Sequence, residues 1–455
     1  MDQHHDSSQG IPAGCPAHGN IPLYGAQFGA DPEATYGYLR YLGLSAAVDI
    51  APGVPVELVT SYDAALYILQ NTEIFRRDSR RWNAMNQGLV PADSPAIPMM
   101  GYRPNALFSD GAAHARLRQA VVDSLATVNE LQLRRKVQQS AQYLISQFGT
   151  ETRGNADVMV SYAMQLPLLV FSDLFGCPPE LGDRVIAGIS GIFQGTPGAN
   201  EILGAALAEL IALKHRQPGT DLTTKLMQHK AQLTDEEVLH QLVTLLSGGT
   251  APTAAAIGTS TALYLGDEGQ AALPVEDAVY QTLWNYAPIA NYAGHYPIHD
   301  IELGDRILRA GDPVLISFAA ANTDPKLTQH REQRSPKAHL SFGAGPHACP
   351  AKDPAFMITV TAVEALLTEL PDLAMRVPFK DLQWAEGPWS RTLVGLPVQF
   401  TPRALAATSP APTAGPQQSA PAPHHAAAAA PQAAARATPQ QRGLYSRFRA
   451  WLNGE

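Results

Sequence analysis

The chain has 455 residues, of which 32 are Lys or Arg and 41 are Asp or Glu, so its formal net charge is −9. An acidic chain lacks the basic surface that binds nucleic acid, and we expect no nucleic-acid partner. The three cysteines, Cys15, Cys177 and Cys349, form no C-x-x-C pair. This excludes a disulfide scaffold and a zinc ribbon, and it favours a cytoplasmic protein.

Residues 1–20 are polar and lack the apolar stretch of a signal peptide, so we expect a disordered N-terminal tail. Residues 21–402 are expected to form one large domain, because 45% of the chain is apolar and can fill a sizeable core. The residue patterns of this region predict a mainly α fold with small β-sheets (α+β).

Apolar residues at three-to-four spacing predict helices over Val121 to Leu144, Ile202 to Lys214 and Ile358 to Leu370. Alternating apolar residues predict strands near Val56 to Thr60, Asp300 to Leu303 and Pro313 to Phe318. Turns are expected at Gly304-Asp305 and Gly311-Asp312. Two segments that contain Gly and Pro, Asn86 to Asn105 and Ile186 to Pro197, are candidates to line a binding pocket.

A long helix is predicted from Asp235 to Gly266. Thr234 and Glu237 form a capping-box sequence at its start. The segment from Val238 to Gly266 carries no charged residue, but its Thr, Ser, Gly and Pro content favours a helix buried in a protein core over a membrane span. Pro252 has no N–H for the carbonyl four residues earlier, so we expect a kink near the middle of the helix. Packing alone could also account for such a kink.

The loop from Ser341 to Ala351 holds two glycines, a proline and Cys349 ahead of an apolar helix that starts near Phe356. A cysteine just before a helix is favoured as a thiolate, and a thiolate can bind a metal. One cysteine cannot build a zinc site, whereas haem iron needs a single proximal protein ligand. A phosphate-binding loop is a weaker alternative, because the third glycine of such a motif is missing.

Beyond the domain, residues 403–441 are nearly all Ala, Pro, Gln, Ser and Thr, which predicts a disordered linker. In residues 442–455, apolar side chains recur at helical spacing with Arg447 and Arg449 between them. This pattern predicts a short basic amphipathic helix, and a frayed tail is the alternative. We expect such a helix to meet a membrane surface or a protein partner.

The Cys349 loop resembles the haem-binding signature of cytochromes P-450, F-G-x-G-x-H-x-C-x-G or A. The residues that match are Phe342, Gly343, Gly345, His347, Cys349 and Ala351. His114 and Arg118 resemble the family's H-x-x-x-R, and the kinked helix resembles its central helix. The resemblance covers residues 21–402 and implies the cytochrome P-450 fold with haem b as the cofactor.

By this resemblance Cys349 is the axial ligand of the haem iron. Phe342 packs beside the haem, and Gly345 lets the loop approach it closely. The resemblance also implies that His114, Arg118 and His347 bind the haem propionates.

The sequence departs from the family at three places. Most members have E-x-x-R where this chain has Gln281 and Trp284. We hypothesise that Trp284 instead stacks on a cation such as Arg334. The family's acid and Thr, which organise water for proton delivery, are matched by Ala251 and Pro252. The flanking Thr250 and Thr253 are the candidates that remain. An Arg expected to contact a propionate is matched by His295.

The resemblance implies a haem-thiolate monooxygenase that inserts one oxygen atom from O2 into a small apolar substrate. The chain has no nicotinamide or flavin fingerprint, so ferredoxin and ferredoxin reductase are the implied electron donors. The missing acid at Ala251 leaves an alternative open. The protein could be a haem-binding regulatory or partner protein with little turnover that docks through its C-terminal tail.

Overall fold

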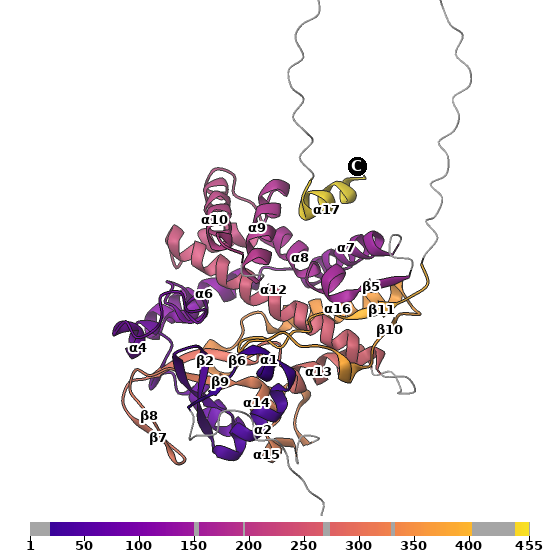
Figure 1. The fold of residues 1–455 in the computed structure, drawn as a ribbon. Helices are drawn as coiled ribbons and strands as arrows, with labels where there is room; N and C mark the ends of the chain where they lie inside the picture. The colour runs from indigo at the N-terminus through magenta and orange to yellow at the C-terminus, as the bar shows by residue number, and fades with distance from the viewer. Residues whose placement is uncertain are drawn as a thin grey trace, which may run out of the picture.

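The computed structural model describes residues 19–149, 154–193, 196–266, 274–328, 333–402 and 442–454. The expected tail and linker lie almost wholly outside these residues. Figure 1 shows helices filling the upper part of the molecule and strands gathering in the lower part. The chain has the predicted mainly α architecture with small sheets, in one domain.

The helical part surrounds α12, Asp235–Leu265, which crosses the molecule in Figure 1. The predicted capping box forms, because the Glu237 N–H donates to Thr234 Oγ1 and the Thr234 N–H donates to Glu237. The helices that pack on α12 are α8 (Leu166–Leu174), α10 (Ala199–Arg216), α11 (Leu222–Met227), α13 (Val275–Asn285) and α16 (Lys352–Glu369). Three more helices pack on these, namely α6 (Gly111–Leu125), α7 (Glu130–Phe148) and α9 (Pro179–Phe193). Their apolar side chains form the largest core.

One helix prediction is wrong. The segment from Val121 to Leu144 is not continuous, because α6 ends at Leu125 and α7 begins at Glu130. Asn129 caps α7 by accepting a hydrogen bond from the Gln132 N–H at 3.0 Å. An N-cap residue lies outside the helical conformation, so the chain turns here despite its helical spacing of apolar residues.

The strands form three sheets. The six-stranded sheet has the order β1 (Ile21–Pro22), β2 (Ser45–Ala51), β3 (Val54–Val59), β9 (Val314–Ser317), β6 (Asn291–Pro297) and β4 (Phe75–Arg76). A second sheet joins β10 (Ala374–Met375), β11 (Pro397–Gln399) and β5 (Asn155–Asp157), and a hairpin joins β7 (Ile301–Leu303) to β8 (Arg306–Leu308). The three predicted strands correspond to β3, β7 and β9.

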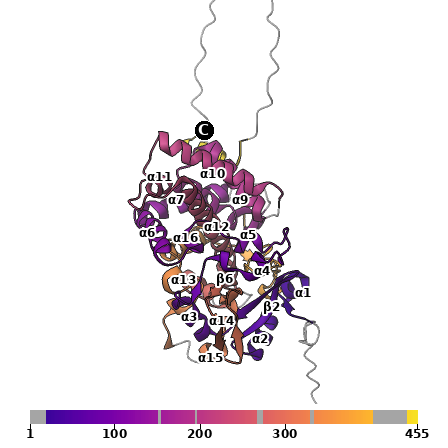
Figure 2. The same cartoon turned by 90° about the vertical axis from the view of Figure 1, so that its left-hand side faces the viewer.

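Two short helices pack against the large sheet and complete the lower part, α2 (Pro32–Leu42) and α14 (Phe318–Asn322). Figure 2 shows the same division from the side, with α9, α10 and α12 above and α2 and α14 below. The predicted turn at Gly304 joins β7 to β8, and its φ of 63° is a conformation that glycine adopts without strain. The site described below lies where α12 faces the loop ahead of α16.

The C-terminal segment contains a helix, α17 (Leu444–Asn453), which lies beside α7, α8 and α9 in Figure 1. Tyr445 and Phe448 are buried, with 1% and 3% of their surface exposed. Arg449 pairs with Asp173 of α8 at 2.9 Å. The apolar face that we expected to meet a membrane or a partner therefore contacts the chain's own helices.

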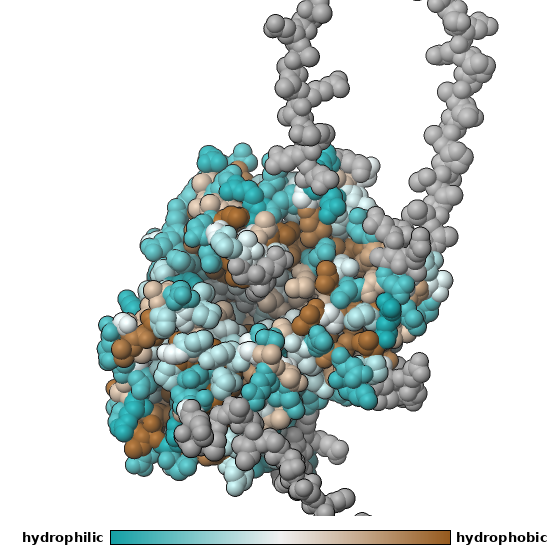
Figure 3. Space-filling view, in the orientation of Figure 1, coloured by the Kyte–Doolittle hydropathy of each residue, from teal (hydrophilic) through white to brown (hydrophobic). Residues whose placement is uncertain are grey.

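Across the described residues, no helix is both long and apolar enough to cross a membrane. The buried position of α12 explains its long uncharged run. On the face shown in Figure 3, hydrophilic residues cover most of the surface and hydrophobic residues are scattered between them.

Candidate active site

The loop that carries Cys349 is held by backbone hydrogen bonds. The Cys349 N–H donates to the Phe342 carbonyl at 2.8 Å, which closes the loop on itself. Gly343 and Gly345 have φ values of 66° and 67°, in the left-handed region that favours glycine. A Cβ on Gly345 would lie 2.2 Å from the Leu69 carbonyl oxygen, so this glycine allows the loop to pack on the helix Tyr62–Gln70.

Cys349 is enclosed in this loop, two residues before Ala351, which is the N-cap residue of α16. Burial raises the pKa of the Cys349 thiol, while the Ala351 N–H and the charge of Arg118 act to lower it. Burial dominates, so the helix start alone does not make Cys349 a thiolate, in contrast to our expectation. A metal cation bound at the sulfur would supply the missing positive charge.

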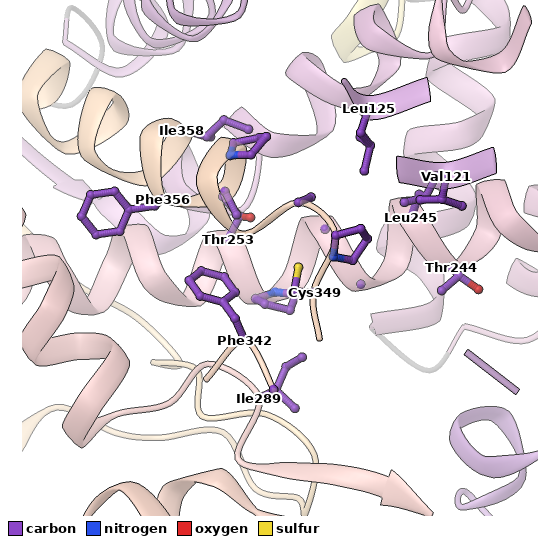
Figure 4. A pocket seen from close by; sticks show the side chains of 18 of the residues that line it. Val121, Leu125, Thr244, Leu245, Thr253, Ile289, Phe342, Cys349, Phe356 and Ile358 are labelled. Atoms are coloured by element: carbon purple, nitrogen blue, oxygen red, sulfur yellow. The ribbon is translucent and has the colours of Figure 1, made fainter. Parts of the chain in front are cut away.

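Cys349 lines a cavity of about 290 Å³ that runs between α6, α12 and α16. Figure 4 shows Phe356 on one side of Cys349, and Val121, Leu125, Thr244 and Leu245 on the other. Phe342, Gly343 and Ala351 also line this cavity, as the resemblance implied. The two segments that we expected to line the pocket, 86–105 and 186–197, contribute none of its described lining residues. That expectation is corrected.

His114, Arg118 and His347 lie together beside the loop. The rings of His114 and His347 are 3.9 Å apart, and Arg118 donates a hydrogen bond to the Ala348 carbonyl. Burial and the charge of Arg118 lower the pKa of His114, and burial holds the pKa of His347 well below its ordinary value. His114 Nε2 is buried without a hydrogen-bond partner among the described residues. A donor of this kind fits a carboxylate.

His295 is also near, but not at the cavity wall. It lies on β6 with 1% of its surface exposed, and Arg77 Nη1 lies 3.4 Å from its ring nitrogens. Burial and the charge of Arg77 hold the pKa of His295 well below its ordinary value, so His295 is neutral. Tyr292, which lies three residues earlier on the same strand, lines the cavity instead of His295.

Sequence reasoning missed Arg77. Its guanidinium is buried, donates to the Gly294 carbonyl at 3.0 Å and lies 4.4 Å from the centre of the Tyr292 ring. The charge of Arg77 is also the second largest cause, after burial, of the low pKa of His347. Arg77 stands in a run of four arginines, RRDSRR, and nothing in that run marks one of them as buried.

On the opposite wall, α12 separates the two candidate threonines. Thr253 lines the cavity, and its hydroxyl has no hydrogen-bond partner among the described residues. Thr250 does not line the cavity, and its hydroxyl donates to the Leu246 carbonyl at 2.7 Å. Pro252 and Gly248 line the cavity beside Thr253. The structure thus brings Thr253, and not Thr250, to the side of the cavity that faces Cys349.

Arg334, the cation suggested for Trp284, packs on another ring. Arg334 lies over the Tyr62 ring, 5.6 Å from its centre. Trp284 Nε1 donates a hydrogen bond to the Pro336 carbonyl at 2.8 Å. This bond links α13 to the segment ahead of the Cys349 loop, where the E-x-x-R pair of other members would act.

The residues present fit a haem group. Cys349, which is partly buried, lines the cavity. Arg118 and the unpaired His114 Nε2 can receive two carboxylates, and the rest of the cavity is mostly apolar. No group of three or more metal-binding side chains occurs among the described residues, so a metal held by protein ligands alone is not supported there. The fold and the site together define a haem-thiolate protein.

Similar proteins of known class show which family of haem-thiolate proteins the chain belongs to. It is 30% identical over 400 residues to cytochrome P450 monooxygenase PikC of Streptomyces venezuelae, a match that covers 84% of this chain and 94% of PikC. It is 28% identical to the polyketide biosynthesis cytochrome P450 PksS of Bacillus subtilis, over 76% of this chain and 89% of PksS. No family model matches the chain. The chain belongs to the cytochrome P450 family.

Solved structures agree with this assignment. CYP154C4 from Streptomyces sp. ATCC 11861 is similar with a TM-score of 0.75 at 27% identity, over 84% of this chain and 98% of that chain. CYP154A1 from Streptomyces coelicolor A3(2) is similar with a TM-score of 0.74 at 26% identity, over 84% of this chain and all of that chain. Membership of the family implies a haem whose iron is held by a thiolate.

Proposed function

We propose that this protein is a haem-thiolate monooxygenase with Cys349 as the axial ligand. The observation that carries the proposal is the partly buried Cys349, which lines a mostly apolar cavity whose opposite wall is formed by α12 around Pro252. When bound, the haem supplies the iron chemistry that inserts one atom of O2 into the substrate, while the other atom is reduced to water by two electrons and two protons.

The chain's own residues hold the cofactor. Arg118 and His114 bind the propionates, and the His347 ring packs on His114 and fixes its orientation. Arg77 lies behind them and adds positive charge to the same side. Phe342 covers the sulfur side of the cavity and keeps water from Cys349.

Proton delivery is assigned to Thr253. Ala251 and Pro252 cannot carry a proton, and the Thr250 hydroxyl is committed to the Leu246 carbonyl. Pro252 also leaves the Gly248 carbonyl without its helical N–H, so an acceptor remains near the Thr253 hydroxyl. A water held between these two groups would connect the cavity to the proton source.

The electrons come from a ferredoxin and its reductase, and the substrate is a small, mainly apolar product of secondary metabolism. The apolar cavity wall supports this substrate class, and PksS carries polyketide biosynthesis in its name. We propose a cytoplasmic location. A membrane contact through α17 would require this helix to leave α7, α8 and α9, on which it packs.

The haem site is tested by the spectrum of the reduced protein with carbon monoxide. The wild type is expected to show the thiolate-type Soret shift, and Cys349→Ser is expected to abolish it. Cys177→Ser is the matched control, because Cys177 is a buried core thiol whose pKa burial raises to about 12. Loss of the shift in the control, or protein that purifies without haem, would contradict the proposal.

The missing acid at Ala251 favours a second candidate, a haem-binding regulatory or partner protein with little turnover. The two are separated by adding surrogate redox partners and a panel of substrates. Coupled product formation supports the monooxygenase. Consumption of NADPH that yields only hydrogen peroxide supports the regulatory protein.

A further inference from the structure

We propose that Gln241 is a substrate-positioning residue that donates a hydrogen bond from its side-chain amide to an uncharged oxygen acceptor of the substrate. This inference rests on the proposed function and narrows its substrate class. The substrate would be a long, mainly apolar molecule with a carbonyl or similar oxygen placed away from the carbon that reacts.

The first observation is an unsatisfied donor inside the cavity. Gln241 lies on α12, has 2% of its surface exposed and lines the cavity that Cys349 also lines. Its Nε2 is buried and has no hydrogen-bond partner among the described residues. Burying an amide without a partner costs free energy, so a cavity that keeps one is suited to a ligand that supplies the acceptor.

The second observation is the apolar surroundings of this donor. Figure 4 shows Val121, Leu125 and Leu245 on the same side of Cys349 as Thr244, which lies three residues after Gln241 on α12. Leucine and valine side chains offer no acceptor. An oxygen of the substrate would therefore have one favourable place in this part of the cavity.

The neighbouring polar group, Thr244, is already satisfied. Its hydroxyl donates to the His240 carbonyl at 2.9 Å and accepts from Asn105 Nδ2 at 2.7 Å. Thr244 lies three residues after Gln241, on the same face of the helix. His240 Nδ1 also has no hydrogen-bond partner among the described residues, but His240 does not line the cavity. Because Thr244 has used its donor, Gln241 is the described cavity-lining side chain in this part of α12 that still has one to offer.

The position of Gln241 sets the length of the substrate. Gly248, which lines the cavity beside Thr253, comes seven residues after Gln241, which corresponds to about 10 Å along the helix axis. A ligand whose oxygen binds Gln241 and whose other end reaches Gly248 must be about that long. A neutral amide also favours a neutral acceptor over a carboxylate, since a carboxylate would be buried without a balancing charge.

The test uses two probes of the same shape, 2-undecanone and 2-methylundec-1-ene, which differ in having C=O or C=CH2 at the same carbon. Binding is titrated by the change in haem spin state in the wild type, Gln241→Met and the control Gln217→Met. Gln217 is exposed at the end of α10, so its replacement tests the chemistry of the substitution away from the cavity.

In the wild type and in Gln217→Met, the ketone is expected to bind more tightly than the alkene. Gln241→Met is expected to lose about 3- to 10-fold of this preference, the range for one neutral hydrogen bond. The ketone-to-alkene affinity ratio of the variant is divided by the same ratio of the wild type. This division cancels the different water solubilities of the two probes.

An unchanged preference in Gln241→Met, with haem content equal to the wild type, would overturn the inference and would indicate that water satisfies Nε2. Failure of the wild type to bind the ketone would overturn it as well. Neither result resembles failure of the proposed function, which would appear as a wild type without haem or without the thiolate-type Soret shift.

Discussion

The docking of α17 can be broken by one added methyl group. Gly182 lies in α9 against Tyr445, and a Cβ at Gly182 would lie 2.2 Å from Tyr445 Cδ1. Tyr445 is 1% exposed and its N–H is bound by Asp183 at 2.7 Å, so its ring cannot swing aside while the helix stays docked. We predict that Gly182→Ala displaces α17 from the domain.

Gly182→Ala has two free-energy effects of opposite sign, one on α9 and one on the docking of α17. Ala in place of Gly inside a helix stabilises that helix by about 0.5–1 kcal/mol, so α9 itself gains stability. Displacing Tyr445 removes the burial of one aromatic side chain, which is worth about 1.5–3 kcal/mol. At about 2 kcal/mol, the docking equilibrium of α17 shifts roughly thirtyfold toward the open state. The rest of the domain is not weakened.

Hydrogen exchange of the α17 backbone amides measures this equilibrium directly. Amides of Leu444–Asn453 are expected to exchange roughly thirtyfold faster in Gly182→Ala than in the wild type, while amides of α12 keep their rates. The matched control is Gly204→Ala in α10, where a Cβ would meet no atom within 4 Å. Gly204→Ala should stabilise its helix as much as Gly182→Ala does, but without a steric clash. Equal protection of α17 in Gly182→Ala and Gly204→Ala would refute the reasoning.

Three further predictions concern the site and the start of α12. Gly345→Ala should purify with most of its haem missing, because the φ of 67° at this position and the nearby Leu69 carbonyl exclude a Cβ. The measurement is the amount of haem per protein, and full haem content would contradict the prediction. His114→Phe should keep the ring but lose Nε2, so haem should transfer to apomyoglobin several-fold faster than from the wild type. Burial, the largest single cause, raises the pKa of Glu237, but the hydrogen bonds from Arg116 and Thr234 and the charge of Arg116 together lower it more, so the net pKa lies below the ordinary value. A lowered pKa stabilises the fold above the pKa of the unfolded state, and this gain is lost as the pH falls below about 4.3. Glu237→Gln should therefore cost about 0.5 kcal/mol at pH 7 and nothing at low pH in urea unfolding.

The sequence predicts best where the structure depends on neighbours in the chain. The capping box of Thr234 and Glu237 joins residues three apart, and the Cys349 loop is one contiguous segment closed by its own backbone. Both follow from local geometry, so both could be read before the fold was known. The helix α17 is local in the same sense.

What α17 packs against was not predictable in this way. An amphipathic pattern shows that one face needs an apolar partner, but Tyr445 and Phe448 would fit a membrane, another protein or their own domain. The choice depends on Gly182 and Asp183, more than 250 residues earlier in the chain. Neither residue carries any signal of that role in its own surroundings.

Arg77 and Gln241 were missed for the same reason. Each has ordinary neighbours in the sequence, and each becomes distinctive only through burial beside residues far away in the chain. Arg77 meets Gly294 and Tyr292 across the large sheet, and Gln241 opens into a cavity whose other wall is more than 100 residues away. A buried charge or donor is defined by what surrounds it, and the sequence does not list those surroundings.

The threonines of α12 show how the fold decides between residues that the sequence ranks equally. Thr250 and Thr253 are three residues apart and lie within about 60° of each other around the helix. Thr250 follows the common helical pattern, in which a hydroxyl binds the carbonyl four residues earlier, and so it is used within the helix. Thr253 makes no such bond among the described residues and stands next to Pro252 at the cavity wall. The effect of Pro252 therefore reaches the cavity, because this residue removes one N–H at the point where the neighbouring hydroxyl is still free to act.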